Sequence, residues 1–147
     1  MTKGGLRLVL DTNVWLDWLA FGDPSVAPIK AAVASGRAEV FIDADCEAEL
    51  ERALGYDLGR KFTLHPTAQA ACLAECRRVA QRITTPAPEA ERAQLPACRD
   101  KDDQKFMDAA LAAGAHFLVT KDRRLLELAR RTARFGIVPP EAFEAGP

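Results

Sequence analysis

The sequence lacks a long apolar stretch and a strong net charge. No apolar run approaches the roughly 18 residues that a membrane-spanning helix needs, and 20 basic against 21 acidic residues leave a formal net charge of -1. This balance argues against a purely electrostatic nucleic-acid-binding module, and less against an enzyme, which needs only a local basic strip. With 147 residues, 48% of them hydrophobic, the chain predicts one domain over residues 1–147, without a signal peptide and in the cytoplasm.

Metal-binding cysteine and histidine motifs are also missing. The chain has 4 cysteines and 2 histidines. A structural zinc site usually has two ligand pairs, but Cys72 and Cys76 have no second pair and His65 and His116 stand far apart. We therefore interpret the cysteines as buried thiols in a reducing compartment.

Short apolar segments alternate with helical patterns along the chain. Strands are predicted at residues 6–10, 39–42, 116–119 and 136–138. Helices are predicted at 14–19, 29–34, 46–54, 66–83 and 123–131. A further helix is predicted to end at Gly114, and a short helical turn is predicted at the C-terminus. Residues 56–65 and 84–96 are predicted to be connections. This alternation predicts an α/β fold, in which helices cover both faces of a mostly parallel sheet of four to five strands.

Acidic residues follow two of the predicted strands. Asp11 comes directly after the strand at 6–10, and Asp122 comes shortly after the strand at 116–119. Both are site candidates, because ligands of open α/β sheets bind just beyond the carboxyl ends of the strands. Asp11 could equally be a simple helix cap, since short polar residues are the usual caps. The choice depends on whether other acids meet it.

Two further acids are candidates to meet the first two. On the helix at 46–54, Glu47, Glu49 and Glu51 cannot share one face, because residues two apart point about 200° from each other. If one of them turns inward, we favour Glu49, at the edge of the face marked by Leu50. Farther along, Asp100, Asp102 and Asp103 exceed what a helix cap requires, and helix phase favours Asp103 over Asp102.

Asp11, Glu49, Asp103 and Asp122 can all reach one edge of the predicted sheet. Four carboxylates without a cation would be costly, because like charges at close range raise each other's pKa. Mg²⁺ and Mn²⁺ accept carboxylate oxygens and keep several waters. Such a site suits phosphoryl chemistry, because the metal activates water and neutralises developing charge.

Four short motifs carry a resemblance to the PIN-domain ribonuclease family. They are Leu10-Asp11-Thr12-Asn13, Glu47-Ala48-Glu49-Leu50, Asp102-Asp103-Gln104-Lys105-Phe106 and Val119-Thr120-Lys121-Asp122. The likeness runs from Leu6 to about Phe143, in the family's order. The block Cys98-Arg99-Asp100-x-Asp102-Asp103 looks most like a bacterial subgroup, the toxins of type II toxin–antitoxin modules.

The resemblance implies a three-layer Rossmann-like fold and hydrolysis of single-stranded RNA by a metal-activated water, leaving a 5′-phosphate and a 3′-hydroxyl. The four acids would hold one or two Mg²⁺ or Mn²⁺ ions, with Asn13, Thr120 and Asp102 supporting them through hydrogen bonds. The expected partners are single-stranded or structured RNA, a cognate antitoxin protein and a second copy in a homodimer, with no membrane association.

A basic strip follows the fourth acid. It comprises Lys121, Arg123, Arg124, Arg130, Arg131 and Arg134. Its first three members are candidates to bind the RNA backbone, although a charged helix face is equally typical of plain solvent exposure. Trp15 and Trp18 favour a core or dimer contact over base stacking, because large aromatic residues usually serve as packing anchors.

Two alternatives to a ribonuclease remain open from the sequence. The first is a metal-dependent phosphohydrolase or phosphotransfer domain with Asp11 as nucleophile, although Asn13 replaces the second acid of the Asp-x-Asp pattern typical of such enzymes. The second is a non-catalytic RNA- or partner-binding module. That module would predict gaps in the acid set, whereas all four positions are acidic.

Overall fold

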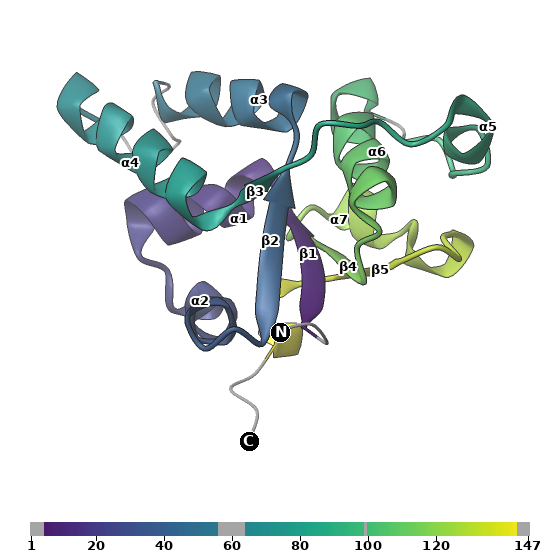
Figure 1. Cartoon of the computed structure of the whole chain (residues 1–147), viewed down its shortest axis with the longest axis horizontal. Coiled ribbons are helices and arrows are strands. Elements are labelled where there is room, and N and C mark those ends of the chain that lie inside the picture. The colour runs from purple at the N-terminus through teal and green to yellow at the C-terminus, as the bar shows by residue number, and fades with distance from the viewer. Residues whose placement is uncertain (1–4, 56–63, 99, 144–147) are drawn as a thin grey trace.

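The structure is a computed structural model that describes residues 5–55, 64–98 and 100–143. Its centre is a five-stranded, all-parallel sheet in the order β3-β2-β1-β4-β5 (Figure 1). The strands are β1 (Leu6–Leu10), β2 (Ala38–Ile42), β3 (Gln81–Arg82), β4 (Phe117–Val119) and β5 (Gly136–Val138). The predicted parallel α/β sheet is thereby confirmed.

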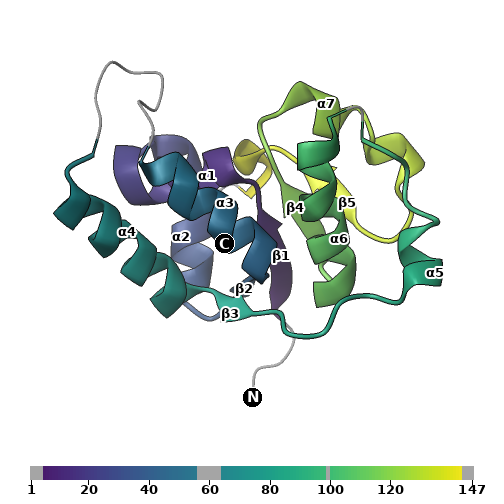
Figure 2. The ribbon, with the colours of Figure 1, turned by 90° about the horizontal axis from the view of Figure 1, so that it is seen from above.

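Helices cover both sides of this sheet. They are α1 (Thr12–Leu16), α2 (Ala27–Ala34), α3 (Ala44–Leu54), α4 (Pro66–Val79), α5 (Glu89–Arg92), α6 (Gln104–Ala113) and α7 (Arg123–Leu126). In Figure 1, α1, α2 and α4 lie to the left of β1 and β2, α6 lies to the right, and α3 passes above the carboxyl ends of the strands. Figure 2 shows the same division from above, with α3 beside α6. The arrangement has the three layers expected.

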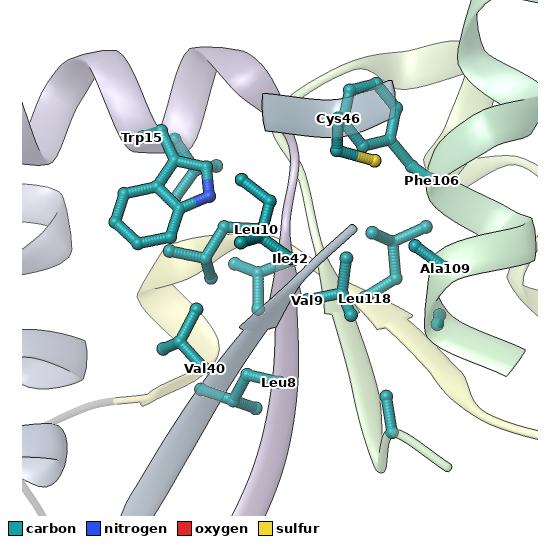
Figure 3. Close-up of a cluster of buried hydrophobic side chains, with 14 of the residues drawn as sticks. Leu8, Val9, Leu10, Trp15, Val40, Ile42, Cys46, Phe106, Ala109 and Leu118 are labelled. Carbon is teal, nitrogen blue, oxygen red and sulfur yellow. The ribbon is translucent and has the colours of Figure 1, made fainter. Parts of the chain in front are cut away.

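The core sits on both faces of the central strand. Leu8, Val9 and Leu10 are at most 1% exposed, as expected for a parallel strand that is covered by helices on each side. Because side chains alternate along a strand, Leu8 and Leu10 face the side of Trp15, and Val9 faces the side of α6 (Figure 3). Burying both faces holds the carboxyl end of β1 in a fixed position.

The region after α4 differs from the prediction. The helix predicted at 66–83 ends at Val79, and Gln81–Arg82 form the edge strand β3. Ala80 is extended, and the N–H of Ile83 donates to the carbonyl of Ile42 over 2.8 Å. The helical interpretation was wrong because two polar residues carry no strand pattern, and only their pairing with β2 makes them a strand.

Smaller differences concern helix lengths. The helix expected at 14–19 is α-helical to Leu16 and continues as a π-helical turn over Asp17–Phe21. The helix expected at 123–131 ends at Leu126 and is followed by a 3₁₀ turn at Ala129–Arg131. The predicted loop at 84–96 contains α5. Most of the connection predicted at 56–65 lies outside the described residues.

Further short 3₁₀ turns cover Pro24–Val26, Lys101–Asp103 and Pro140–Phe143. Gly114 ends α6 with a φ of 61°, a left-handed conformation that glycine adopts without a steric penalty. Among the described residues, no helix combines the length and apolar character needed to cross a bilayer.

Candidate active site at the carboxyl edge of the sheet

The order of the strands reverses between β1 and β4. The chain moves from β1 outward to β2 and β3, then returns to place β4 on the other side of β1. Leu10 pairs with Val119, and the N–H of Asp11 donates to the carbonyl of Val119 over 2.9 Å. The segments after these two strands therefore meet at a topological switch point, where open α/β sheets bind their ligands.

Asp11 points into this edge of the sheet and is 5% exposed. It occupies the N-cap position of α1, but its side chain makes no capping hydrogen bond. Its Oδ2 instead accepts the hydroxyl proton of Thr120 over 2.7 Å. Burial raises the pKa of Asp11, the bond from Thr120 opposes that rise, and the carboxylates of Asp122 and Glu49 add to it.

Thr120 links two of the acids. Its fully buried hydroxyl donates to Asp11 and accepts the backbone N–H of Asp122 over 2.9 Å. The side chain of Asp122 in turn accepts the N–H of Arg124 over 2.8 Å, which caps α7. A single hydroxyl therefore connects the side chain of Asp11 to the backbone of Asp122.

Asp103 enters the same edge from the start of α6. It is half-buried, and its side chain accepts no hydrogen bond from any described residue. Burial raises its pKa to about 6, with further increases from Asp122 and Asp11. The neighbouring Asp102 is exposed. The carboxylate of Asp103 therefore interacts electrostatically with those of Asp11 and Asp122.

Glu49 approaches from α3 with both carboxylate oxygens occupied. Oε2 accepts the hydroxyl of Thr12 over 3.0 Å, and Oε1 accepts the ammonium of Lys105 over 2.5 Å. Lys105 and the buried Thr12 were not candidates from the sequence. The signal for each was its place beside an acid, because Thr12 follows Asp11 and Lys105 stands one helical turn after Asp102.

Glu47, not Glu49, is the most buried glutamate of α3. It is 5% exposed and accepts from Arg77 over 2.6 Å and from Arg82 over 2.7 Å. Our preference for Glu49 as the inward-turning glutamate was therefore wrong about burial. The burial of Glu47 could not be predicted from the sequence, because the two arginines that compensate its charge lie on α4 and β3. Glu49 is nevertheless the glutamate whose charge acts on Asp11.

Much of the basic strip is tied to acids. Lys121 forms an ion pair with the buried Asp17, and Arg124 lies 3.7 Å from both Asp100 and Asp122. Arg134 pairs with Glu91 over 3.0 Å. The remaining members, which form no ion pair with the described residues, are Arg123, Arg130 and Arg131. Lys121 is therefore paired with an acid of the protein itself.

Other candidates lie away from the acids. Asn13 is exposed and makes no hydrogen bond to the four acids. Trp15 is 1% exposed in the core, which confirms the packing interpretation, and Trp18 packs against it with ring centroids 5.4 Å apart. The cysteines all carry free thiols, buried except at Cys98, which is half-buried.

The donor set at this edge fits a hard divalent cation in chemistry and in charge. It consists of carboxylates, and burial together with neighbouring carboxylates raises the pKa of Asp11 and Asp103, so a cation would favour their charged forms. Within the described part of the chain, no three carboxylate, imidazole or thiol side chains are already placed to hold an ion. Binding would therefore require the carboxylates to draw closer together.

Comparison with known proteins gives one family and two similar structures. The family model described as PIN domain matches residues 7–124. The fold is similar to that of VapBC2 from Rickettsia felis, solved bound to a DNA fragment from their promoter, with a TM-score of 0.59, 14% identity, and coverage of 90% of this chain and 97% of that chain. It is also similar to PAE2754 from Pyrobaculum aerophilum, with a TM-score of 0.58, 16% identity, and coverage of 96% and 90%. The comparison with curated proteins found no match.

Proposed function

The chain belongs to the PIN-domain family, and on that premise we propose that it is a Mg²⁺- or Mn²⁺-dependent endoribonuclease, the toxin of a toxin–antitoxin pair. The observation that supports the proposal is that the charges of Asp122 and Glu49 act on Asp11, and those of Asp122 and Asp11 act on Asp103, at the switch point of the sheet. These acids come from four separate segments, and burial, with a smaller contribution from mutual repulsion, raises the pKa of Asp11 and Asp103. A helix cap or a solvated surface explains neither feature.

In this proposal Asp11, Glu49, Asp103 and Asp122 hold the metal. When bound, a divalent ion activates water and neutralises charge on the phosphate. Thr120 keeps Asp11 and the backbone of Asp122 in a fixed relation through its two hydrogen bonds. Asp103 keeps its carboxylate oxygens free of hydrogen bonds from the described residues and can therefore turn toward a cation.

The RNA substrate would be guided by the arginines that remain available. Arg123, Arg130 and Arg131 are exposed and form no ion pair with described residues, so they can contact backbone phosphates. Lys121 has a structural role instead, because its ion pair with Asp17 connects the turn before Asp122 to the segment after α1.

The toxin assignment follows from the Cys98–Asp103 block and is supported by the likeness of fold to VapBC2. An antitoxin protein and a homodimer are part of the same proposal. Co-purification with the product of the neighbouring reading frame tests the first, and the mass of the purified protein in solution tests the second.

The test of the enzymatic function is Asp11→Asn. We expect it to lower Mn²⁺-dependent cleavage of a defined single-stranded RNA by at least about 100-fold, because it removes the most buried charge of the proposed metal site. It should also relieve any toxicity on expression. Asp45→Asn, which changes an exposed aspartate of α3, is the matched control and should cleave like the wild type.

Two results would contradict this function. Cleavage that survives Asp11→Asn, or that continues in EDTA, would exclude a metal site built on Asp11. A covalent phosphoaspartate at Asp11 would instead favour the phosphohydrolase alternative. Circular dichroism of both variants ensures that any loss reflects chemistry and not unfolding.

A further inference from the structure

Lys105 is the only lysine or arginine that contacts Glu49 in the described part of the chain. Its ammonium donates to Glu49 Oε1 over 2.5 Å and to the backbone carbonyl of Asp102 over 2.8 Å. We propose that Lys105 serves as a built-in cation for Glu49, so that the site takes a single divalent ion, held by Asp11, Asp103 and Asp122. This inference rests on the proposed function and narrows its set of metal ligands.

The contact between Lys105 and Glu49 differs from an ordinary surface ion pair. The two side chains are 20% and 26% exposed, so both charges are largely withdrawn from water. Lys105 is also anchored by the carbonyl of Asp102, and its ammonium lies 5.7 Å from the centroid of the Phe106 ring. An ammonium held by several groups and screened little by solvent occupies a defined position.

Both oxygens of Glu49 already accept a hydrogen bond, which leaves Glu49 fewer free lone pairs for a metal than Asp103 has. Oε1 receives Lys105 and Oε2 receives Thr12. Asp103 accepts no hydrogen bond from the described residues, and at Asp11 only Oδ2 is bonded to a side chain. Asp122 accepts the backbone N–H of Arg124 at Oδ1. Among the four acids, Glu49 is therefore the one with a side-chain hydrogen bond at both oxygens in the described part of the chain.

The distribution of charge also separates Glu49, which is paired with Lys105, from Asp11, Asp103 and Asp122. The ammonium of Lys105 forms its ion pair with Glu49. At Glu49 the neutralisation that a second divalent ion would supply is already provided by Lys105. A divalent ion at Glu49 would have to displace the ammonium or lie beside it, and like charges at this range repel.

The experiment measures Mn²⁺ binding to the full chain by electron paramagnetic resonance of free Mn²⁺. We expect one ion per wild-type chain. Lys105→Met should create a second site, or tighten Mn²⁺ binding at least about tenfold, because Glu49 becomes available. Lys105→Arg keeps the charge and should bind like the wild type. Lys101→Met removes the same charge from an exposed lysine nearby and is the matched control.

A second variant tests the inference independently of Lys105. Glu49→Gln should keep the single ion with an affinity within about threefold of the wild type, because Glu49 holds the lysine and not the metal. Loss of the ion in Glu49→Gln would overturn the inference. Two ions in the wild type, or unchanged binding in Lys105→Met, would overturn it as well.

The two proposals fail in different ways. If the wild type binds no Mn²⁺ and does not cleave RNA, both are wrong. If the wild type binds Mn²⁺ and cleaves RNA, but Lys105→Met binds like the wild type, the proposed function stands and only the role of Lys105 is wrong.

Discussion

Thr120 positions two of the acids of the candidate site, Asp11 and Asp122. Its hydroxyl uses both its proton and a lone pair, donating to Asp11 and accepting from the backbone of Asp122. Because the side chain is fully buried, no water competes for either bond. At the scale of single residues, the relative position of Asp11 and Asp122 therefore depends in part on one neutral group.

A half-buried acid outside the site gives a prediction about pH. Burial raises the pKa of Asp108 on α6 above its ordinary value, against opposing contributions from Gln104 and Arg92. The folded protein therefore holds this proton more tightly than the unfolded chain, and ionisation costs stability as the pH rises through the folded-state pKa. Asp108→Asn should raise the melting temperature at about pH 7, and the gain should shrink at about pH 4.

Thermal unfolding followed by circular dichroism at both pH values measures this effect. Asp45→Asn, at an exposed position, is the control and should change the melting temperature little at either pH. A gain for Asp108→Asn that is the same at both pH values would show that ionisation of Asp108 is not its cause.

At the scale of elements, Glu47 joins three segments that are distant in the sequence. It lies on α3 and pairs with Arg77 of α4 and Arg82 of β3. The short edge strand has only two residues paired with β2, so this side-chain contact adds to a weak backbone ladder. The ion pair between Glu47 and Arg82 therefore helps the backbone hydrogen bonds to β2 hold β3 in place.

Glu47→Gln should destabilise the fold by about 1–2 kcal/mol. It weakens two charge-assisted hydrogen bonds, and the value is kept low because the arginine side chains are 56% and 48% exposed. Urea unfolding measures the change. Glu75→Gln breaks a more exposed pair with Arg78 on α4 and should cost less than about 0.5 kcal/mol. Equal losses in the two variants would contradict a special role for Glu47.

At the scale of the whole molecule, folding itself assembles the acids. β1, α3, α6 and the segment after β4 each bring one carboxylate, and the hydrophobic core holds these elements together despite the repulsion. Burial and mutual repulsion of these carboxylates lower the stability of the folded chain, and a cation that binds only the folded chain would offset this loss. The metal should therefore stabilise the protein.

Mn²⁺ at about 100 times its dissociation constant should add about 2.7 kcal/mol to the free energy of unfolding. For a chain of this size that corresponds to a rise in melting temperature of about 5–10 °C. Differential scanning calorimetry with and without Mn²⁺ tests this, and EDTA should reverse the shift. Asp103→Asn should reduce it, and an undiminished shift in that variant would place the ion elsewhere.

Much of the fold could be predicted from local patterns. Four of the five strands were predicted close to their observed positions, because short apolar runs between capping residues are signals within a few neighbours. β3 was missed, since its two polar residues become a strand only beside β2. The expectation of one domain over residues 1–147 stays a prediction, because both ends lie outside the described residues.

The sequence by itself determined the alternation of elements and the acids that follow two of the strands, Asp11 and Asp122, since both are properties of neighbouring residues. Only the tertiary structure decided which charges are compensated. Lys105 and Glu49 are 56 residues apart, Glu47 and Arg77 are 30 apart, and Thr120 and Asp11 are 109 apart. No local pattern encodes such pairs, because each depends on two elements packing in register, and the free energy of a charge depends on what lies against it in space.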